Sequence, residues 1–248
     1  MNTFKMNNIK LEIKDKSEEI HLFIATPCYN SQVTSKYTEC LIKTCNFLNE
    51  KDIKYTVKII NNDIVTTARN MLAHNFMNSE LNFTHMLFID ADIIWKPQDI
   101  MNLLEHDLEC VIGVYPNKQY YLRKDESGIN INILSSSQLY QPIQIKEDNE
   151  NLIKVEFAAT GFMMLKKTAF KRIEGDIKTF TLPQNKDNIN TENYEHVYNY
   201  FHCNIVNSEY LTEDYHFSLL LNKNGGEIYA DKRVGLVHTG NHHYGSLK

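Results

Sequence analysis

The sequence predicts an α/β fold, a mostly parallel β-sheet covered on both faces by helices. In its first half, short runs of large and β-branched apolar residues alternate four times with stretches whose apolar residues recur at helical spacing. This alternation is typical of parallel sheets with crossover helices. The 248 residues are enough for one large domain, and no Pro-, Gly- or Ser-rich linker divides them.

The elements of the first half are expected in a fixed order. The expected strands are residues 20–25, stopped by Thr26-Pro27, then 55–60, the apolar run that begins at His85, and 111–115. The expected helices carry apolar stripes over 33–48 and 64–76, and a further one begins near Pro97. Thr34 or Ser35 can begin the first helix, Asp63 can cap the second, and Pro97 suits a first helical position.

The second half is less regular. Residues 117–151 are polar and predict a long loop or an irregular hairpin, and 155–159 predict a strand. Residues 181–210 are rich in Asn, Tyr and Glu with little periodicity. Thr212 can cap a helix with an inward apolar stripe, and short strands near 228–229 and 234–237 complete the expected core.

Composition excludes several classes of protein. With 26 basic and 31 acidic residues the net charge is −5, so no overall field attracts nucleic acid or an anionic membrane. The first twenty residues lack a hydrophobic signal core, and no apolar stretch reaches the roughly 18 residues of a membrane span. Five cysteines without a C-x-x-C pair indicate reduced, buried thiols. A cytoplasmic protein is expected.

The most informative motif is the run His85-Met-Leu-Phe-Ile-Asp90-Ala-Asp92. Its apolar part suits a strand buried on both faces, which puts both carboxylates at the carboxyl end, where open α/β sheets bind ligands. Two oxygen donors at i and i+2 can share a divalent cation. A plain turn, with aspartates that cap the next helix, is an equally good interpretation of the motif in isolation. The apolar run before it favours the cation, because close carboxylates repel each other.

Further polar residues lie at the ends of the other elements. His238 directly ends an apolar strand and can be a third ligand beside carboxylates, whereas His242 and His243 are more typical of a surface loop. Asp214 lies on the expected inward stripe of its helix and is a candidate general base. Glu213 is expected to point elsewhere, and acidic residues in a first helical turn are also favoured by the helix dipole alone.

Two features suit a phosphate or a base. Arg69 lies off the apolar stripe of its helix, so it is either a solvated residue or a ligand of a diphosphate. Residues 26–30, Thr-Pro-Cys-Tyr-Asn, close the first strand. Tyr29 could lie against a nucleobase there, and a structural turn is an equally good interpretation.

Taken in order, these motifs resemble those of the metal-dependent glycosyltransferases with the GT-A fold. The matching segments are Thr26–Asn30, Thr67–Asn70, Phe88–Asp92, Gly161–Met163, Glu213–Tyr215 and His238–Gly240. They cover residues 20–120 well and 155–245 more loosely. The sequence is most similar to the small family-2-like and Anp1-like branches, which include enzymes of large DNA viruses.

The resemblance implies a single GT-A (Rossmann-like) domain, with an extension over 1–19, a nucleotide-sugar half over 20–116 and an acceptor half over 117–248. It implies a donor, preferably a UDP-sugar, bound by Thr26, Pro27, Tyr29, Asn62, Asp63, Arg69, Asp90 and Ala91. The implied ligands of Mn²⁺, with Mg²⁺ as an alternative, are Asp90, Asp92 and His238. Asp214 matches the base of inverting enzymes, with Glu213 as the second candidate, and Gly161, Phe162 and His242 would line the sugar or acceptor pocket.

The expected partners are the donor and a hydroxyl acceptor, either a glycan, a protein or another molecule, with no nucleic acid; a homodimer is left open. Retaining chemistry is an alternative to inversion, because GT-A folds support both. A nucleotidyltransferase is a second hypothesis, but residues 26–31 lack the glycines of a phosphate loop. A third is a non-catalytic carbohydrate-binding domain, against which the presence of Asp92 and His238 argues. A Rossmann dehydrogenase is disfavoured, since no G-x-G-x-x-G follows a strand.

Overall fold

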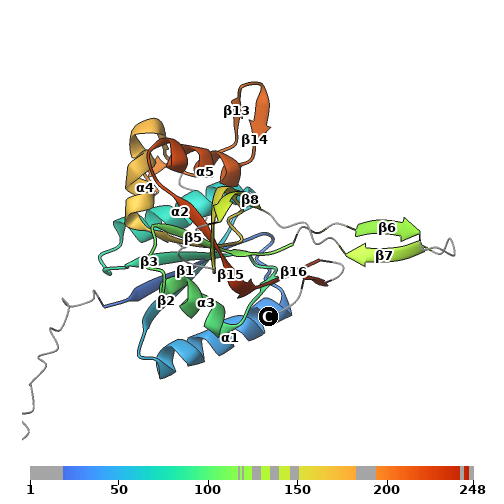
Figure 1. The fold of residues 1–248 in the computed structure, drawn as a ribbon. Helices are drawn as coiled ribbons and strands as arrows, with labels where there is room; N and C mark the ends of the chain where they lie inside the picture. The colour runs from blue at the N-terminus through green and yellow to red at the C-terminus, as the bar shows by residue number, and fades with distance from the viewer. Residues whose placement is uncertain are drawn as a thin grey trace, which may run out of the picture.

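A mixed β-sheet of eight strands forms the centre of the structure (Figure 1). The computed structural model describes residues 19–116, 118, 120–124, 130–134, 140–145, 151–182, 194–240 and 243–245. The strand order is β2-β1-β3-β10-β5-β15-β9-β8. In chain order the strands are β1 His21–Cys28, β2 Lys54–Asn61, β3 His85–Ile89, β5 Cys110–Val114, β8 Tyr140–Ile145, β9 Leu152–Ala158, β10 Phe162–Lys166 and β15 Ile228–Gly235.

Strand direction confirms a mixed sheet in which most strands run the same way. β1 pairs in parallel with β2 and β3, and β5 pairs in parallel with β15. β10 is antiparallel to both β3 and β5, and β9 is antiparallel to both β15 and β8. Of the eight strands, all except β9 and β10 therefore run in one direction. Their carboxyl ends meet at one edge, which is where a ligand site is expected.

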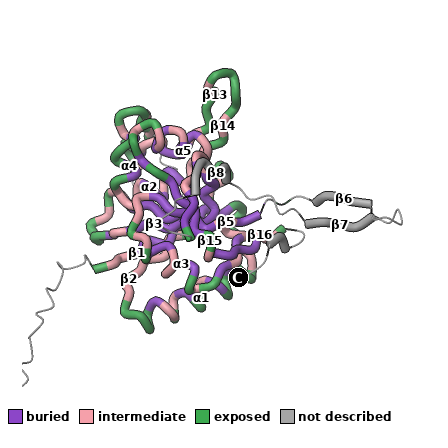
Figure 2. Tube along the Cα trace, in the orientation of Figure 1, coloured by how far each residue is buried: buried purple, intermediate pink, exposed green. Residues whose placement is uncertain are grey.

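Helices cover both faces of the sheet, as predicted. They are α1 Ser35–Glu50, α2 Val65–Asn78, α3 Pro97–Leu104, α4 Lys167–Ile173 and α5 Glu213–Lys223, with a 3₁₀ turn at Glu174–Asp176. In β1 the side chains alternate between faces: Phe23 packs in the core beneath α2, α4 and α5, and Leu22 packs beneath α1 and α3. One of these two cores lies on each face of the sheet. Figure 2 shows that the buried residues gather in the central strands.

Short strands complete the structure. They are β4 Ile93–Ile94 with β16 Val237–Thr239 and β17 His243–Gly245, β6 Tyr120–Lys124 with β7 Asn130–Leu134, β11 Thr179–Phe180 with β12 Val197–Tyr198, and β13 Asn204–Val206 with β14 Glu209–Leu211. The hairpin expected within 117–151 is present as β6–β7, and β8 adds an edge strand to the main sheet. No helix in the described ranges is long and apolar enough to cross a membrane.

Two expectations about element ends are wrong. The first strand does not stop at Thr26-Pro27, because parallel pairing with β2 continues to Cys28 opposite Asn61. Asp63 does not cap α2: the cap position is Ile64, whose N–H donates to Asn62 Oδ1 at 2.9 Å. Three other expectations are confirmed, since Thr34 caps α1, Pro97 begins α3 and Thr212 holds the cap position of α5.

Candidate functional site

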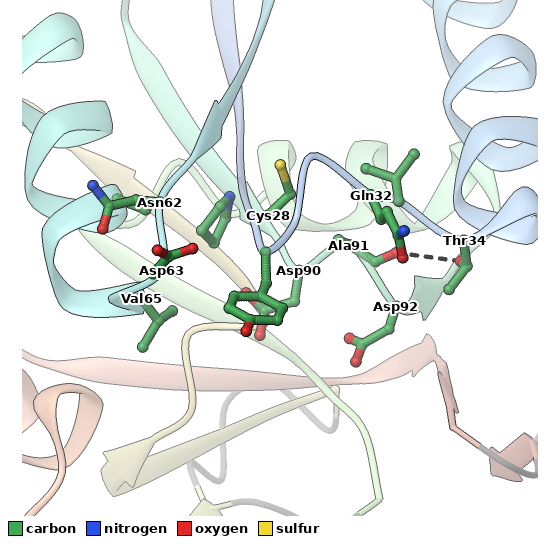
Figure 3. A pocket seen from close by; sticks show the side chains of 13 residues that line it. Cys28, Gln32, Thr34, Asn62, Asp63, Val65, Asp90, Ala91 and Asp92 are labelled. Atoms are coloured by element: carbon green, nitrogen blue, oxygen red, sulfur yellow. Dashed lines mark hydrogen bonds between the residues drawn. The ribbon is translucent and has the colours of Figure 1, made fainter.

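A cleft of about 660 Å³ opens at the carboxyl ends of β1, β2 and β3 (Figure 3). α1 and α2 leave β1 and β2 on opposite faces of the sheet, and β3 lies on the other side of β1 from β2. The connections that follow β1 and β2 therefore run to opposite faces of the sheet. Such a reversal leaves a crevice at the strand ends, where open α/β sheets bind ligands. The cleft is lined by Pro27, Cys28, Tyr29, Gln32, Val33, Thr34, Asn62, Asp63, Val65, Ala68, Asp90, Ala91 and Asp92.

Backbone hydrogen bonds fix the loops around the cleft. Thr34 N–H donates to Ala91 O at 3.0 Å, which joins the start of α1 to the Asp-Ala-Asp turn. Ile93 N–H closes that turn on Asp90 O at 3.1 Å, and Thr239 N–H donates to Asp92 O at 2.7 Å. The two aspartates are thereby held between β3 and β16 rather than on a free loop.

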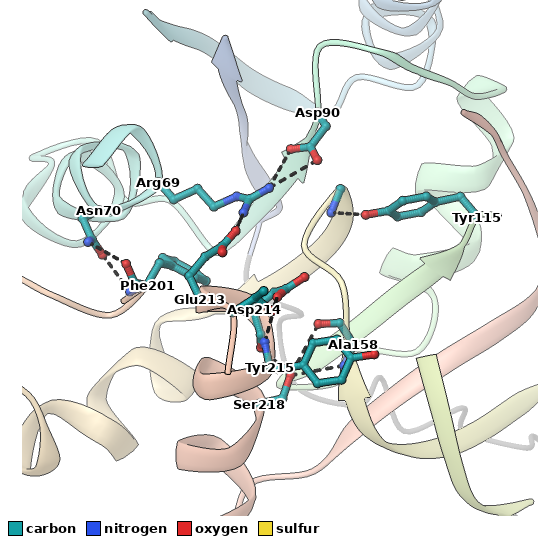
Figure 4. Close-up of polar contacts among 12 residues, drawn as sticks. Arg69, Asn70, Asp90, Tyr115, Ala158, Phe201, Glu213, Asp214, Tyr215 and Ser218 are labelled. Carbon is teal, nitrogen blue, oxygen red and sulfur yellow. Dashed lines mark hydrogen bonds and ion pairs between the residues drawn. The ribbon is translucent and has the colours of Figure 1, made fainter. Parts of the chain in front are cut away.

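Asp90 is bound to a buried arginine (Figure 4). Arg69 Nη2 donates to Asp90 Oδ1 and Oδ2 at 3.0 and 3.2 Å, and Nη1 donates to Glu213 Oε1. Burial alone would lower the pKa of Arg69, but the two carboxylates outweigh it and raise the pKa, so the guanidinium stays charged. Arg69 is 5% exposed, so the interpretation as a solvated residue off the buried stripe is wrong.

Asp92 lies beside His238. Asp92 Oδ1 lies 3.5 Å from His238 Nε2, while His238 Nδ1 lies 3.1 Å from the carbonyl oxygen of Pro116. If Nδ1–H donates to that carbonyl, a neutral ring turns the Nε2 lone pair towards the carboxylate. Two acceptors that face each other need a proton or a cation between them, and the backbone bond at Nδ1 is the usual support of a metal-binding histidine.

Lys118 provides a cation at Asp92. Its Nζ contacts Asp92 Oδ2, the carboxylate oxygen that does not face His238. Burial acts to raise the pKa of Asp92, but the contacts with His238 and Lys118 outweigh it and lower the pKa. Asp92 is therefore ionised at neutral pH.

The donor set fits part of the coordination of a divalent ion. No group of three or more His, Cys, Asp or Glu side chains is placed for a metal within the described ranges. Asp92 and His238 nevertheless offer one oxygen and one nitrogen to a common point, and diphosphate oxygens and water commonly supply the remaining ligands of such ions.

Tyr115 contacts residues that adjoin both aspartates: Gly161 beside Asp90, and His238 beside Asp92. Gly161 N–H donates to Tyr115 Oη at 2.9 Å, Asp90 N–H donates to Gly161 O at 3.0 Å, and the Tyr115 and His238 rings are 5.2 Å apart, edge to face. A Cβ at position 161 would lie 2.3 Å from Tyr115 Oη, so only glycine permits this approach. Tyr115 was not among the predicted site residues, although it ends an expected strand at the carboxyl edge.

The start of α5 differs from the expectation. Glu213, which was expected to point elsewhere, faces Arg69 with a side chain only 13% exposed. Asp214 Oδ1 accepts from Thr212 Oγ1 at 2.5 Å and from Tyr215 N–H at 2.9 Å. Both bonds are on one oxygen, and among the described residues nothing bonds to Asp214 Oδ2.

Some of the predicted residues lie away from the cleft. Thr26 is fully buried with its hydroxyl 2.5 Å from Tyr37 Oη, so it cannot contact a nucleobase. Phe162 is fully buried beside Trp95 and does not line a sugar pocket. His242 lies outside the described residues. Six lining residues were not among the predicted site residues: Cys28, Gln32, Val33, Thr34, Val65 and Ala68. Lys118 was also missed.

No protein-family profile matches the chain, and no curated protein sequence matches it. Among solved structures, the chain is similar to A197 from STIV, with 13% identity, 89% of this chain and 86% of that chain covered, and a TM-score of 0.44. It is similar to a mutant of Drosophila β1,4-galactosyltransferase 7 in complex with manganese, UDP-Gal and xylobiose, with 8% identity, 92% and 70% covered, and a TM-score of 0.45.

A third similar structure is GalNAc-T7 with UDP, GalNAc and Mn²⁺, with 8% identity, 90% of this chain and 44% of that chain covered, and a TM-score of 0.44. These identities and scores are too low to transfer an activity. A function for the chain has to be argued from its own side chains.

Proposed function

We propose that the protein is a metal-dependent glycosyltransferase that moves a sugar from a nucleotide-sugar donor to a hydroxyl acceptor. The observation that carries the proposal is the pair Asp92 and His238, whose Oδ1 and Nε2 atoms lie 3.5 Å apart at one end of a cleft at the carboxyl edge of the sheet. A turn that only capped the next helix would not bring a histidine from residue 238 to face Asp92.

The part of the cleft that is lined by Tyr29, Asn62 and Asp63 suits the nucleobase of a donor. Tyr29 is 62% exposed and offers an aromatic face, and the polar side chains of Asn62 and Asp63 also line the cleft. UDP is the preferred nucleotide, on the resemblance of the sequence motifs to GT-A enzymes. The diphosphate would then extend from this end towards Asp92.

Asp92 and His238 would hold Mn²⁺. Their mixed set of one oxygen and one nitrogen ligand suits Mn²⁺ better than Mg²⁺. When bound, the ion supplies a positive charge that stabilises the departing diphosphate. Arg69 has its terminal nitrogens on Asp90 and Glu213 and therefore acts as a positioning residue rather than a diphosphate ligand. It fixes Asp90 at the cleft and α5 against α2.

Asp214 is the proposed base. The acceptor oxygen forms a bond to the anomeric carbon, the bond from that carbon to the phosphate oxygen breaks, and the diphosphate leaves with the electron pair. The acceptor proton passes to Asp214 Oδ2, the carboxylate oxygen that bonds no described residue. Attack from the face opposite the leaving group gives an inverted anomeric configuration.

The test is a panel of nucleotide sugars with a mixture of hydroxyl acceptors, with and without Mn²⁺, scored for release of nucleoside diphosphate. Release is expected with UDP-sugars, and excess EDTA is expected to abolish it. Asp92→Asn is the matched inactive variant, and an exposed change such as Asp52→Asn is the control. Release of pyrophosphate would identify a nucleotidyltransferase instead. If no donor is turned over and UDP with Mn²⁺ leaves the melting temperature unchanged, the proposal is wrong.

A further inference from the structure

We infer that Lys118 competes with the divalent cation for Asp92 and becomes a ligand of the donor's diphosphate once the cation has displaced it. The inference rests on the proposed function, and it concerns how the binding of metal and nucleotide are coupled. Three features carry it: the charge of the cleft, the contact between Lys118 and Asp92, and the engagement of Arg69.

The lining of the cleft is unfavourable for a diphosphate. Among the described residues, it contains three carboxylates, Asp63, Asp90 and Asp92, and neither a lysine nor an arginine. Arg69 lies beside Asp90, but its two terminal nitrogens are bound to Asp90 and Glu213, which together carry more charge than it does. A diphosphate at this place therefore needs cations from elsewhere, because like charges in a partly enclosed site repel strongly.

Lys118 is placed to be one of these cations. Its ammonium contacts Oδ2 of Asp92, and the other oxygen, Oδ1, is the proposed metal ligand that faces His238. Its side chain is 34% exposed, so it can change partner without disturbing the core. The ammonium is also a compact charge on a flexible stem, which suits a change of partner better than a forked guanidinium does.

The consequence is a coupling between two ligands. A divalent ion held by Asp92 Oδ1 and His238 Nε2 repels an ammonium on Oδ2 of the same carboxylate, so Lys118 opposes the binding of metal alone and moves away when the ion binds. The displaced ammonium can pair with a diphosphate oxygen, so a new charged contact replaces the one lost with Asp92 when the nucleotide is present. Metal and nucleotide should each bind more tightly in the presence of the other, and by the same factor.

The experiment measures Mn²⁺ binding to the protein by electron paramagnetic resonance of the free ion, with and without UDP, and UDP binding by calorimetry. Lys118→Met retains the length of the stem without the charge, and Lys36→Met, on an exposed lysine paired with Glu39, is the control. For Lys118→Met we expect Mn²⁺ alone to bind about 3–10-fold more tightly and UDP with Mn²⁺ about 10-fold more weakly, equivalent to one charged contact.

Unchanged affinities in Lys118→Met would overturn the inference, and so would weaker binding of Mn²⁺ alone. If Mn²⁺ binds neither the wild type nor Lys118→Met, with or without UDP, the proposed metal site itself is wrong. Binding of Mn²⁺ alone to the variant but not to the wild type would support competition directly. Urea denaturation of both variants shows whether folding is intact, which is expected because both lysines are exposed.

Discussion

The Arg69 guanidinium on α2 and the Glu213 carboxylate at the start of α5 form an ion pair across 144 positions of the sequence. Arg69 also binds Asp90, which follows β3. A single buried cation on α2 therefore contacts both the start of α5 and the turn that carries Asp90. Because the Arg69 charge is buried, removal of any one of these three partners leaves a charge without its counter-ion.

Removal of the Arg69 charge should therefore be costly. Arg69→Met leaves two carboxylates without their cation, and we expect the free energy of unfolding to fall by about 3–5 kcal/mol, measured by urea denaturation. Arg69→Lys, which retains the charge but cannot bind both carboxylates with a planar fork, should lose less. Lys36→Ala, in an exposed pair with Glu39, should change it by about 0.5 kcal/mol at most. A loss below about 1 kcal/mol for Arg69→Met would contradict the enclosed pair.

How much of this site the sequence predicts depends on the range of the interaction. The carboxyl-end position of Asp90 and Asp92 follows from the apolar run before them, a local signal. The partners of Arg69 lie 21 and 144 positions away, and no local pattern shows that a polar residue beside Ala68 is buried. His238 was expected beside the carboxylates from its place at a strand end and from the family resemblance, but its contact with Asp92 spans residues far apart in the sequence.

The fold shows the same limit. Alternating strands and helices predicted the parallel strands, because crossover connections leave a periodic pattern. The antiparallel β10 between β3 and β5 was not predicted, because Phe162–Lys166 has the same apolar composition as a parallel strand. Composition shows that a strand is buried, but not which neighbours it pairs with.

The close approach at Gly161 gives a second prediction. Gly161→Ala puts a Cβ 2.3 Å from Tyr115 Oη and 2.6 Å from Cζ, so the ring or the turn must move. We expect a loss of about 1–3 kcal/mol in unfolding free energy and weaker binding of UDP with Mn²⁺, since Tyr115 also packs against His238. Gly175→Ala is the matched control, because a Cβ there meets no atom within 4 Å. Equal stability of the two variants would show that the site tolerates the displacement of Tyr115.

Substitution of Asp90 should affect stability, whereas substitution of Asp92 should affect the binding of Mn²⁺. Asp90→Asn weakens a bond to the buried Arg69, and we expect a loss of about 2–3 kcal/mol in unfolding free energy. Asp92 is one third exposed, so Asp92→Asn should leave stability nearly unchanged and remove Mn²⁺ binding. Denaturation and titration of Mn²⁺ on the same samples check both. Full Mn²⁺ affinity in Asp92→Asn would remove Asp92 from the ligands.

Asp231 provides a pH-dependent prediction away from the site. It is fully buried; burial acts to raise its pKa, but hydrogen bonds from Arg233 and His106 outweigh it and lower the pKa. The folded pKa is thus below the unfolded value of about 3.9, so the stabilisation is present above that value and lost as pH falls through the folded pKa. Asp231→Asn should be less stable than wild type by about 2–3 kcal/mol at pH 7.

The difference should shrink as the pH falls below about 4, because protonation then removes the same charge from the wild type. Urea denaturation between pH 3 and pH 7 would measure it, with the exposed Asp52→Asn as the control. A constant difference across that range would show that the loss in Asp231→Asn comes from packing rather than from charge.

The choice between the two acids at the start of α5 is the most direct test of the chemistry. Glu213 is bound to Arg69, whereas Asp214 keeps one oxygen without a described partner. Asp214→Asn retains volume and most hydrogen bonding but cannot take a proton. We expect transfer to fall by about 10²-fold or more while UDP and Mn²⁺ bind as in the wild type.

Thr212→Val is the control for this variant, because it removes the hydroxyl that donates to Asp214 Oδ1 but leaves the carboxylate. It should retain most of the transfer rate. Glu213→Gln should instead lose stability together with activity, since it breaks the ion pair with Arg69. Near-normal transfer by Asp214→Asn would assign the base to Glu213 or another group. A product that keeps the anomeric configuration of the donor would exclude a single-displacement base at either position, because inversion follows from attack opposite the leaving group.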